Sequence, residues 1–208
     1  MKKFLTIFLG ILLCIGVIGG SFALAKHIDG KITNEQSSEK PSTSDKDNDE
    51  GETLTEWSLC TDVSELAEGD QIVIVVEGHD YALGTTQNAS NRSAVEVVKE
   101  GQTITFGDDV QVITLEAGMV ENTFAFNVGD GYLYAPSSSS NQLKTHASID
   151  ENSSWSIVID ESGIASIVAQ GASTKNILLY NMASNLFSCY SSTQESVVIY
   201  KLVDVEKE

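Results

Sequence analysis

Cysteine, histidine and basic residues are all scarce in this sequence. Its 208 residues include three Cys, three His and 12 Lys and Arg, against 30 Asp and Glu. Three cysteines are too few for a disulfide scaffold. The histidines, at positions 27, 79 and 146, have no Cys or second His at ligand spacing, so we expect no histidine-based metal site. The net charge of −18 predicts a protein that repels nucleic acids and anionic lipid headgroups.

Motifs for catalysis are also missing. The sequence contains neither a G-x-S-x-G nucleophile motif nor a Walker-type glycine loop. His79-Asp80 could form half of an acid–base pair, but the dipeptide is also typical of a turn. The paired acids at 108–109, 150–151 and 160–161 border strand-like runs, where Asp favours turns. We therefore predict no catalytic residue, no metal, no cofactor and no enzymatic activity.

The first 25 residues have the pattern of an export segment. Lys2 and Lys3 precede an uncharged run from Phe4 to Ala25 that ends in Ala-Leu-Ala. Small residues at these positions suit signal peptidase, which predicts cleavage before Lys26. The run is also long enough to remain as a membrane anchor. Both alternatives insert residues 1–25 into the membrane at least transiently and place the rest outside the cytoplasm, either secreted or tethered to the outer face.

Residues 26–55 form an acidic, Ser-rich stretch with almost no apolar side chains, which predicts a flexible linker. The remaining segment, 56–208, is long enough for one domain with a core and carries 22 acids and six bases. Cys60 and Cys189 lie at apolar positions of strand-like runs in this segment. We interpret them as buried thiols, and a bridge between them stays an alternative.

Short β-type runs fill residues 56–208. Three sequence features recur in them, each three times and always in the same order. Leucine-centred runs are the first feature, at Leu83, Leu133 and Leu178. A Ser-Asn pair then opens a strand, with its asparagine at 91, 141 and 185. An alternating strand follows, beginning at Val110, Trp155 and Val197. Adding the strand before each leucine run gives three repeats of four strands, which predicts an all-β fold, specifically a β-trefoil. Its last strand, Val197–Leu202, must then pair near its first.

Two resemblances agree with this prediction. Residues 155–167 resemble the close of a ricin-type lectin repeat, with a Trp strand, an acidic Gly turn and the next strand. The segment departs from that family because Ser153, and not Gln, stands two residues before Trp155. The chain from Trp57 onward also resembles β-trefoil domains of bacterial cell-surface and secreted proteins, most clearly at residues 81–88 and 186–192. This resemblance implies a surface module and transfers no catalytic residue.

Exposed aromatic rings are the best candidates for a ligand site, because the apolar faces of sugars stack on them. Tyr132 and Tyr134 flank an inward leucine and should face outward, and Tyr180 lies in the third repeat. Asp130 and Asn181 could hydrogen-bond a sugar hydroxyl beside these rings. The alternative is that the tyrosines only cover the barrel.

Together these features predict an exported, non-catalytic module that binds a glycan or cell wall. The alternative is an adhesin or inhibitor that binds a surface protein through the Thr85–Arg92 loop.

Overall fold

The computed structural model describes residues 53–136 and 138–206. The predicted export segment and most of the predicted linker lie outside the described residues. Strand β1 (Thr53–Leu59) begins three residues before the predicted start of the domain at Glu56. Within the described residues, no helix is long and apolar enough to cross a membrane.

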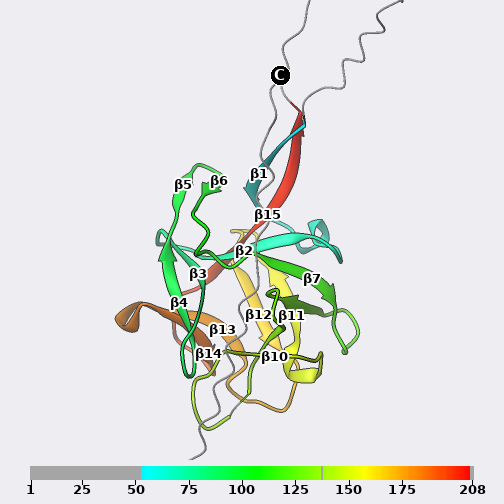
Figure 1. The fold of residues 1–208 in the computed structure, drawn as a ribbon, viewed down its shortest axis with the longest axis vertical. Helices are drawn as coiled ribbons and strands as arrows, with labels where there is room; N and C mark the ends of the chain where they lie inside the picture. Colours follow the sequence, from blue (N-terminus) through cyan, green and yellow to red (C-terminus); the bar gives the residue numbers. More distant parts are fainter. Residues whose placement is uncertain (1–52, 137, 207–208) are drawn as a thin grey trace, which may run out of the picture. The chain divides into compact units, whose positions relative to one another are not determined.

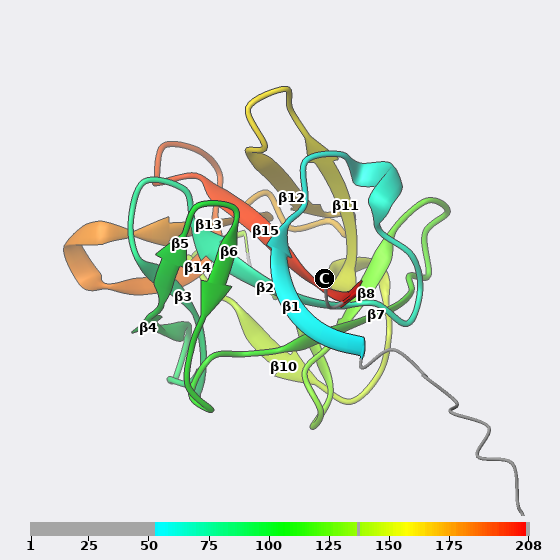
Figure 2. The same cartoon turned by 90° about the horizontal axis from the view of Figure 1, so that it is seen from above.

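Six antiparallel strands close a barrel, which Figure 2 shows from above. In order around the barrel they are β2 (Gln71–Val76), β7 (Ile113–Ala117), β8 (Phe124–Asn127), β11 (Ser154–Ile159), β12 (Ala165–Ala169) and β15 (Val197–Glu206). Each strand pairs with the next, and β15 pairs back with β2. Closure leaves none of the six with a free sheet edge.

Three hairpins connect the barrel strands in pairs. They are β3 (Tyr81–Gln87) with β4 (Arg92–Glu96), β9 (Tyr132–Tyr134) with β10 (Lys144–His146), and β13 (Ile177–Asn181) with β14 (Leu186–Tyr190). Each repeat therefore contributes two barrel strands and one hairpin, which is the β-trefoil arrangement. The predicted all-β fold of three four-strand repeats is confirmed.

The leucine period that predicted the repeats reflects the core. Leu83, Leu133 and Leu178 are all fully buried in the main hydrophobic cluster. The third feature was placed wrongly in repeat one. Val110 makes only an isolated bridge to Gly84, and β7 begins three residues later at Ile113. Ile113, Trp155 and Val197 are the buried equivalents, and they lie 42 residues apart in both steps.

Three strands are additional to the predicted four-strand repeats. β1, β5 (Val98–Glu100) and β6 (Thr103–Thr105) form a ribbon beside β15. They accompany a second apolar cluster that includes Val73, Val75 and Tyr200. This second cluster explains why five successive residues of β2 are buried, because a strand with one covered face buries only alternate residues.

The chain ends of the described domain lie together. β1 pairs with β15 along its whole length, from Thr53 opposite Glu206 to Leu59 opposite Tyr200. β15 also pairs with β2, the first of the predicted strands, so the prediction that the last strand pairs near the first is confirmed. The ribbon of β1 and β15 projects from one end of the barrel, while β10, β13 and β14 lie toward the other end (Figure 1).

Short 3-10 turns complete the fold. They are η1 (Val63–Glu65), η2 (Glu151–Ser153) and η3 (Met182–Ser184).

Both described cysteines are free thiols in the core, 1% and 0% exposed for Cys60 and Cys189. The interpretation of these residues as small buried hydrophobes is confirmed.

Candidate functional site on the second hairpin

The strand register defines equivalent positions in the three hairpins. In each hairpin, one residue pairs with the barrel strand that precedes it. These residues are Ala82, Tyr132 and Ile177. Four residues of each hairpin then share one face, because directly opposed residues and residues two apart point the same way. In the second hairpin they are Tyr132, Tyr134, Lys144 and His146, which we call the hairpin-two face.

Only the second repeat has polar aromatic and charged side chains at these positions that are not buried, because the one equivalent tyrosine, Tyr190, is buried. All four residues of the hairpin-two face are half-buried. The equivalents in repeat one are Ala82, Gly84, Ser93 and Val95, and those in repeat three are Ile177, Leu179, Ser188 and Tyr190. In repeat one the first two are buried, and in repeat three the last two are buried. The same scaffold thus leaves one of three hairpin faces open and polar.

Aromatic stacking and a carboxylate fix the rings of this face. The Tyr134 and His146 rings stack with centroids 4.1 Å apart and an interplanar angle of 11°. The Tyr132 hydroxyl donates to Glu116 Oε2 at 2.8 Å, and Asn127 Nδ2 donates to Glu116 Oε1 at 2.6 Å. Hydrogen bonds from Asn127 and then Tyr132 lower the pKa of the Glu116 carboxyl, while the bond to Glu116 raises the pKa of Tyr132. Because Tyr132 donates to Glu116, its hydroxyl oxygen remains able to accept a hydrogen bond from a ligand.

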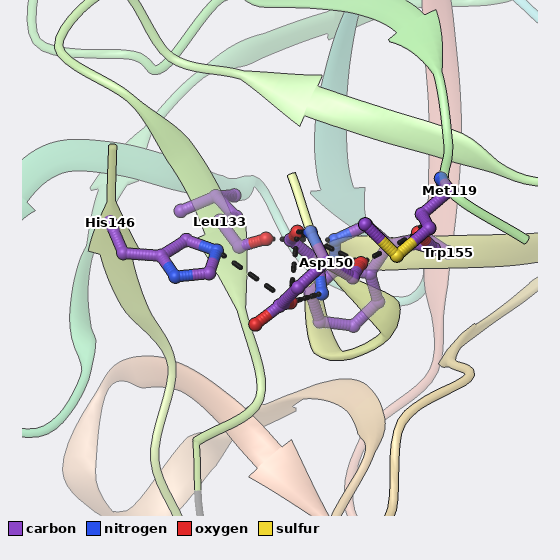
Figure 3. Close-up of polar contacts among 7 residues, drawn as sticks. Met119, Leu133, His146, Asp150 and Trp155 are labelled. Carbon is purple, nitrogen blue, oxygen red and sulfur yellow. Dashed lines mark hydrogen bonds and ion pairs between the residues drawn. The ribbon is translucent and has the colours of Figure 1, made fainter. Parts of the chain in front are cut away.

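A tight turn supports the same face from the next strand (Figure 3). His146 Nε2 lies 3.8 Å from Asp150 Oδ1. Asp150 caps η2, accepting from Ser153 N at 3.0 Å through Oδ1 and from Ser154 Oγ at 2.7 Å through its backbone carbonyl. The fully buried Trp155 donates its indole N–H to Leu133 O at 3.0 Å, directly behind the two tyrosines. The core therefore holds β9 in place from within.

The structure separates the predicted site residues into two groups. Tyr132 and Tyr134 lie together and face outward as predicted, and Asp130 lies two residues before Tyr132 in an exposed turn. The expectation that the Tyr180 ring is exposed is wrong. Tyr180 is 2% exposed, stacks on Tyr81 with centroids 6.0 Å apart and donates its hydroxyl to Asn185 Oδ1 at 2.8 Å.

Asn181 is also occupied by the fold. Its side-chain oxygen accepts from Ser184 N at 3.0 Å and caps η3. Repeat three therefore does not offer the tyrosine-lined hollow that Tyr180 and Asn181 were expected to form.

Arg92, the proposed contact of the alternative protein-binding loop, is buried at 2% exposure. Its guanidinium donates to Thr85 O, Gln87 Oε1, Gln111 Oε1 and Thr145 Oγ1 at distances from 2.5 to 3.2 Å. Burial lowers the pKa of Arg92, and the negative charge of Asp130 opposes this shift. Arg92 is thus an internal residue and is not available to a protein partner.

The pair His79-Asp80 lies in the turn between β2 and β3, as the turn interpretation predicted. Lys99 Nζ holds this turn by donating to three backbone carbonyls, those of Val76, Glu77 and His79, at 2.7 to 3.0 Å. In the part of the chain that the structure describes, no group of three or more His, Cys, Asp or Glu side chains could hold a metal ion.

The sequence reasoning missed Lys144, His146, Glu116 and Asn127. Lys144 and His146 lie on β10, and the sequence did not fix the register of this strand against β9. Glu116 and Asn127 come from two barrel strands, β7 and β8, whose pairing the sequence did not reveal.

Comparisons with known proteins support the fold and do not show a function. No protein-family model matches the sequence, and no curated protein matches it. Among solved structures, a GH43 β-1,3-galactosidase is 12% identical with a TM-score of 0.50, over 70% of this chain and 29% of that one. The chain thus corresponds to less than a third of that protein's length.

Two smaller proteins are matched over almost their whole length. The BEL β-trefoil, in an apo crystal form, is 17% identical with a TM-score of 0.48, over 67% of this chain and 96% of that one. The designed threefold-symmetric protein ThreeFoil is 16% identical with a TM-score of 0.41, over 65% and 99%. The closed barrel and its three hairpins define this chain as a β-trefoil independently of these matches.

Proposed function

We propose that this protein is an exported, non-catalytic module that binds a glycan through the hairpin-two face. Tyr132 and the stacked Tyr134–His146 pair supply aromatic surface for the apolar face of a sugar ring. The Tyr132 hydroxyl oxygen and the Asp130 carboxylate supply hydrogen-bond acceptors for sugar hydroxyls. Small sites of this kind combine aromatic surface with a few placed polar groups.

One observation carries the proposal, namely the divergence of the second hairpin from its two equivalents. A scaffold with three similar repeats needs no exposed polar aromatic face for its own stability, because the first and third hairpins carry small or apolar side chains at these positions, apart from Tyr190, which is buried. Residues that depart from the pattern of their repeats without a gain in packing are candidates for function. Here the departure includes all four positions of one face.

The placement of the chain ends favours display of this face. The described domain enters and leaves through the paired strands β1 and β15, and β10 lies toward the opposite end of the barrel (Figure 1). If residues 1–25 are retained as a membrane anchor, the tether joins the domain at β1, at the other end of the barrel from the second hairpin (Figure 1). If residues 1–25 are cleaved, the same face is free in solution.

Glycan-array binding of the full-length protein tests the proposal. The array should include peptidoglycan fragments, β-1,3-galactan oligomers and acidic polysaccharides. We expect saturable binding that Tyr132→Ala and Tyr134→Ala each weaken at least about tenfold, which corresponds to the loss of one stacked ring. Tyr81→Ala, in the first repeat, is the matched control and should bind as the parent protein does.

Two outcomes would reject the proposal. One is that the folded protein binds no glycan on the array and instead binds a protein. The other is that Tyr81→Ala weakens binding as much as the two changes on the hairpin-two face.

A further inference from the structure

The described domain has so few basic residues that the interaction partners of each one can be stated. Residues 53–206 contain 21 Asp and Glu and only five basic residues, namely Arg92, Lys99, Lys144, Lys175 and Lys201. An acidic surface of this kind leaves few positions where an anion could be held.

Four of the five cationic side chains have partners within the domain. Arg92 and Lys99 make the internal hydrogen bonds described above. Lys201 Nζ pairs with Asp70 Oδ2 at 2.8 Å and donates to Glu65 O at 2.6 Å. Lys175 Nζ donates to Ser139 O at 3.5 Å, across the contact between the second and third repeats.

Lys144 is the exception, and it lies on the hairpin-two face. No hydrogen bond or ion pair joins its ammonium to another of the described residues. It lies directly opposite Tyr134 in the β9–β10 pair. β10 is the last strand at one end of the strand order. Its side chain is half-buried, which is common for a lysine that covers apolar surface with its aliphatic part.

The nearby carboxylates do not take up this charge. Glu116 accepts from both Tyr132 and Asn127. Asp150 caps η2, and the Nε2 atom of His146 is directed toward it (Figure 3). Neither carboxylate forms an ion pair with Lys144 within the described part of the chain.

From this arrangement we infer that the glycan bound by the hairpin-two face carries an anionic substituent, a carboxylate or a phosphate, that Lys144 reads beside the Tyr134 ring. This inference rests on the proposed function. Lys suits the role as a point charge that binds either anion without a fixed fork geometry. The other acids of the domain repel anionic polymers at long range, so a bound anion depends on this one close contact.

Paired ligands make the test specific. Isothermal titration of the full-length protein would compare oligogalacturonate with its methyl ester, which removes the charge and keeps the sugar rings. A phosphorylated oligosaccharide and its unphosphorylated form provide the second pair. We expect the protein to prefer the charged member of at least one pair, and that pair identifies the source of the anion.

The variant Lys144→Gln should lower affinity for the charged member about tenfold or more and lower affinity for the neutral member much less. Lys175→Gln is the matched control and should change neither affinity. Circular dichroism of both variants checks that they remain folded.

The inference is overturned if the protein binds charged and neutral members equally, or if Lys144→Gln weakens both to the same extent. Neutral glycans that bind in a Tyr132-dependent manner would in that case still support the proposed function. If no glycan binds at all, the proposed function fails and this inference fails with it.

Discussion

Substitution of the buried Arg92 tests how the three hairpins are held together. In each hairpin the core leucine pairs with a residue on the second strand. The residue two positions before that partner is equivalent in the three repeats, and it is Arg92, Leu143 or Phe187. All three are buried, and only the first repeat places a charge there. Arg92→Leu therefore makes repeat one resemble repeat two in the core of the hairpin layer.

We expect Arg92→Leu to destabilise the domain by about 3 kcal/mol, although leucine suits a buried position. Four acceptors lose a charged donor, and each such bond contributes about 1.5–3 kcal/mol net. Water can replace the donor at Thr85, Gln87 and Thr145, which are exposed or half-buried, but not at Gln111, which is 7% exposed. Relief from burying a guanidinium opposes the loss by several kcal/mol.

Urea unfolding followed by tryptophan fluorescence measures this change, with the m value expected to stay constant. The double variant Arg92→Leu/Gln111→Met removes both partners of the buried bond. It also removes the bonds from Gln111 Nε2 to the carbonyls of Val112 and Val128, but these residues are half-buried and water can replace the donor. The double variant should therefore recover about 1 kcal/mol or more relative to Arg92→Leu alone. A single variant as stable as the parent protein would refute the reasoning, because the polar network would then contribute nothing. A double variant less stable than the single one would refute the assignment of the loss to Gln111.

Three further predictions concern the core and the last strand. Trp155→Phe removes the indole hydrogen bond to Leu133 O and should cost about 2–4 kcal/mol in urea unfolding, because no water can replace the donor. Burial raises the pKa of Cys60 from 9.0 to about 11 and raises that of Cys189 as well, so a disulfide reagent at pH 8 should label both thiols only after unfolding. Because the folded-state pKa is raised, the stabilising effect of the protonated thiols is complete below about pH 9 and is lost as pH rises toward 11, which urea midpoints across that window would show. A chain that stops before Val197 loses the strand that pairs with β1, β2 and β12, and circular dichroism should show it unfolded.

The repeats of this fold could be predicted because a buried leucine recurs at the same place in each hairpin, 50 and then 45 residues apart. Leu83, Leu133 and Leu178 all point into one cluster, and any large change there would leave a cavity. The extra strands could not be predicted in the same way. β5 and β6 form an insertion of three-residue strands in one repeat only, and their apolar residues cover the outside of the barrel, where no repeat pattern applies.

The alternation of inward and outward residues along a strand predicted part of the candidate site, and it failed where it was not applied consistently. Alternation from the buried Leu133 correctly placed Tyr132 and Tyr134 on the outer face. The same argument applied to Leu178 would have buried Tyr180, which lies two residues later in the same strand and shares its inward face. Lys144 remained hidden for a different reason, because nine residues separate Tyr134 from β10 and the sequence does not fix the register across such a loop.

Two glycines in the turn before β9 allow the geometry of the hairpin-two face to be tested separately from its chemistry. Gly129 and Gly131 both have positive φ, +95° and +147°, so alanine is strained at either position. At Gly129 nothing lies within 4 Å of an added Cβ, and Gly129→Ala should cost only about 1 kcal/mol and leave glycan affinity unchanged. At Gly131 the added Cβ would collide with the backbone carbonyl oxygen of His146, so β10 must move away from β9. Gly131→Ala should therefore weaken glycan binding at a temperature where both variants remain folded, because it shifts the His146 ring from Tyr134 without removing a single contact group. Equal glycan affinities for the two variants would show that binding does not depend on the spacing of β9 and β10, and the ligand site would then have to lie elsewhere on the domain.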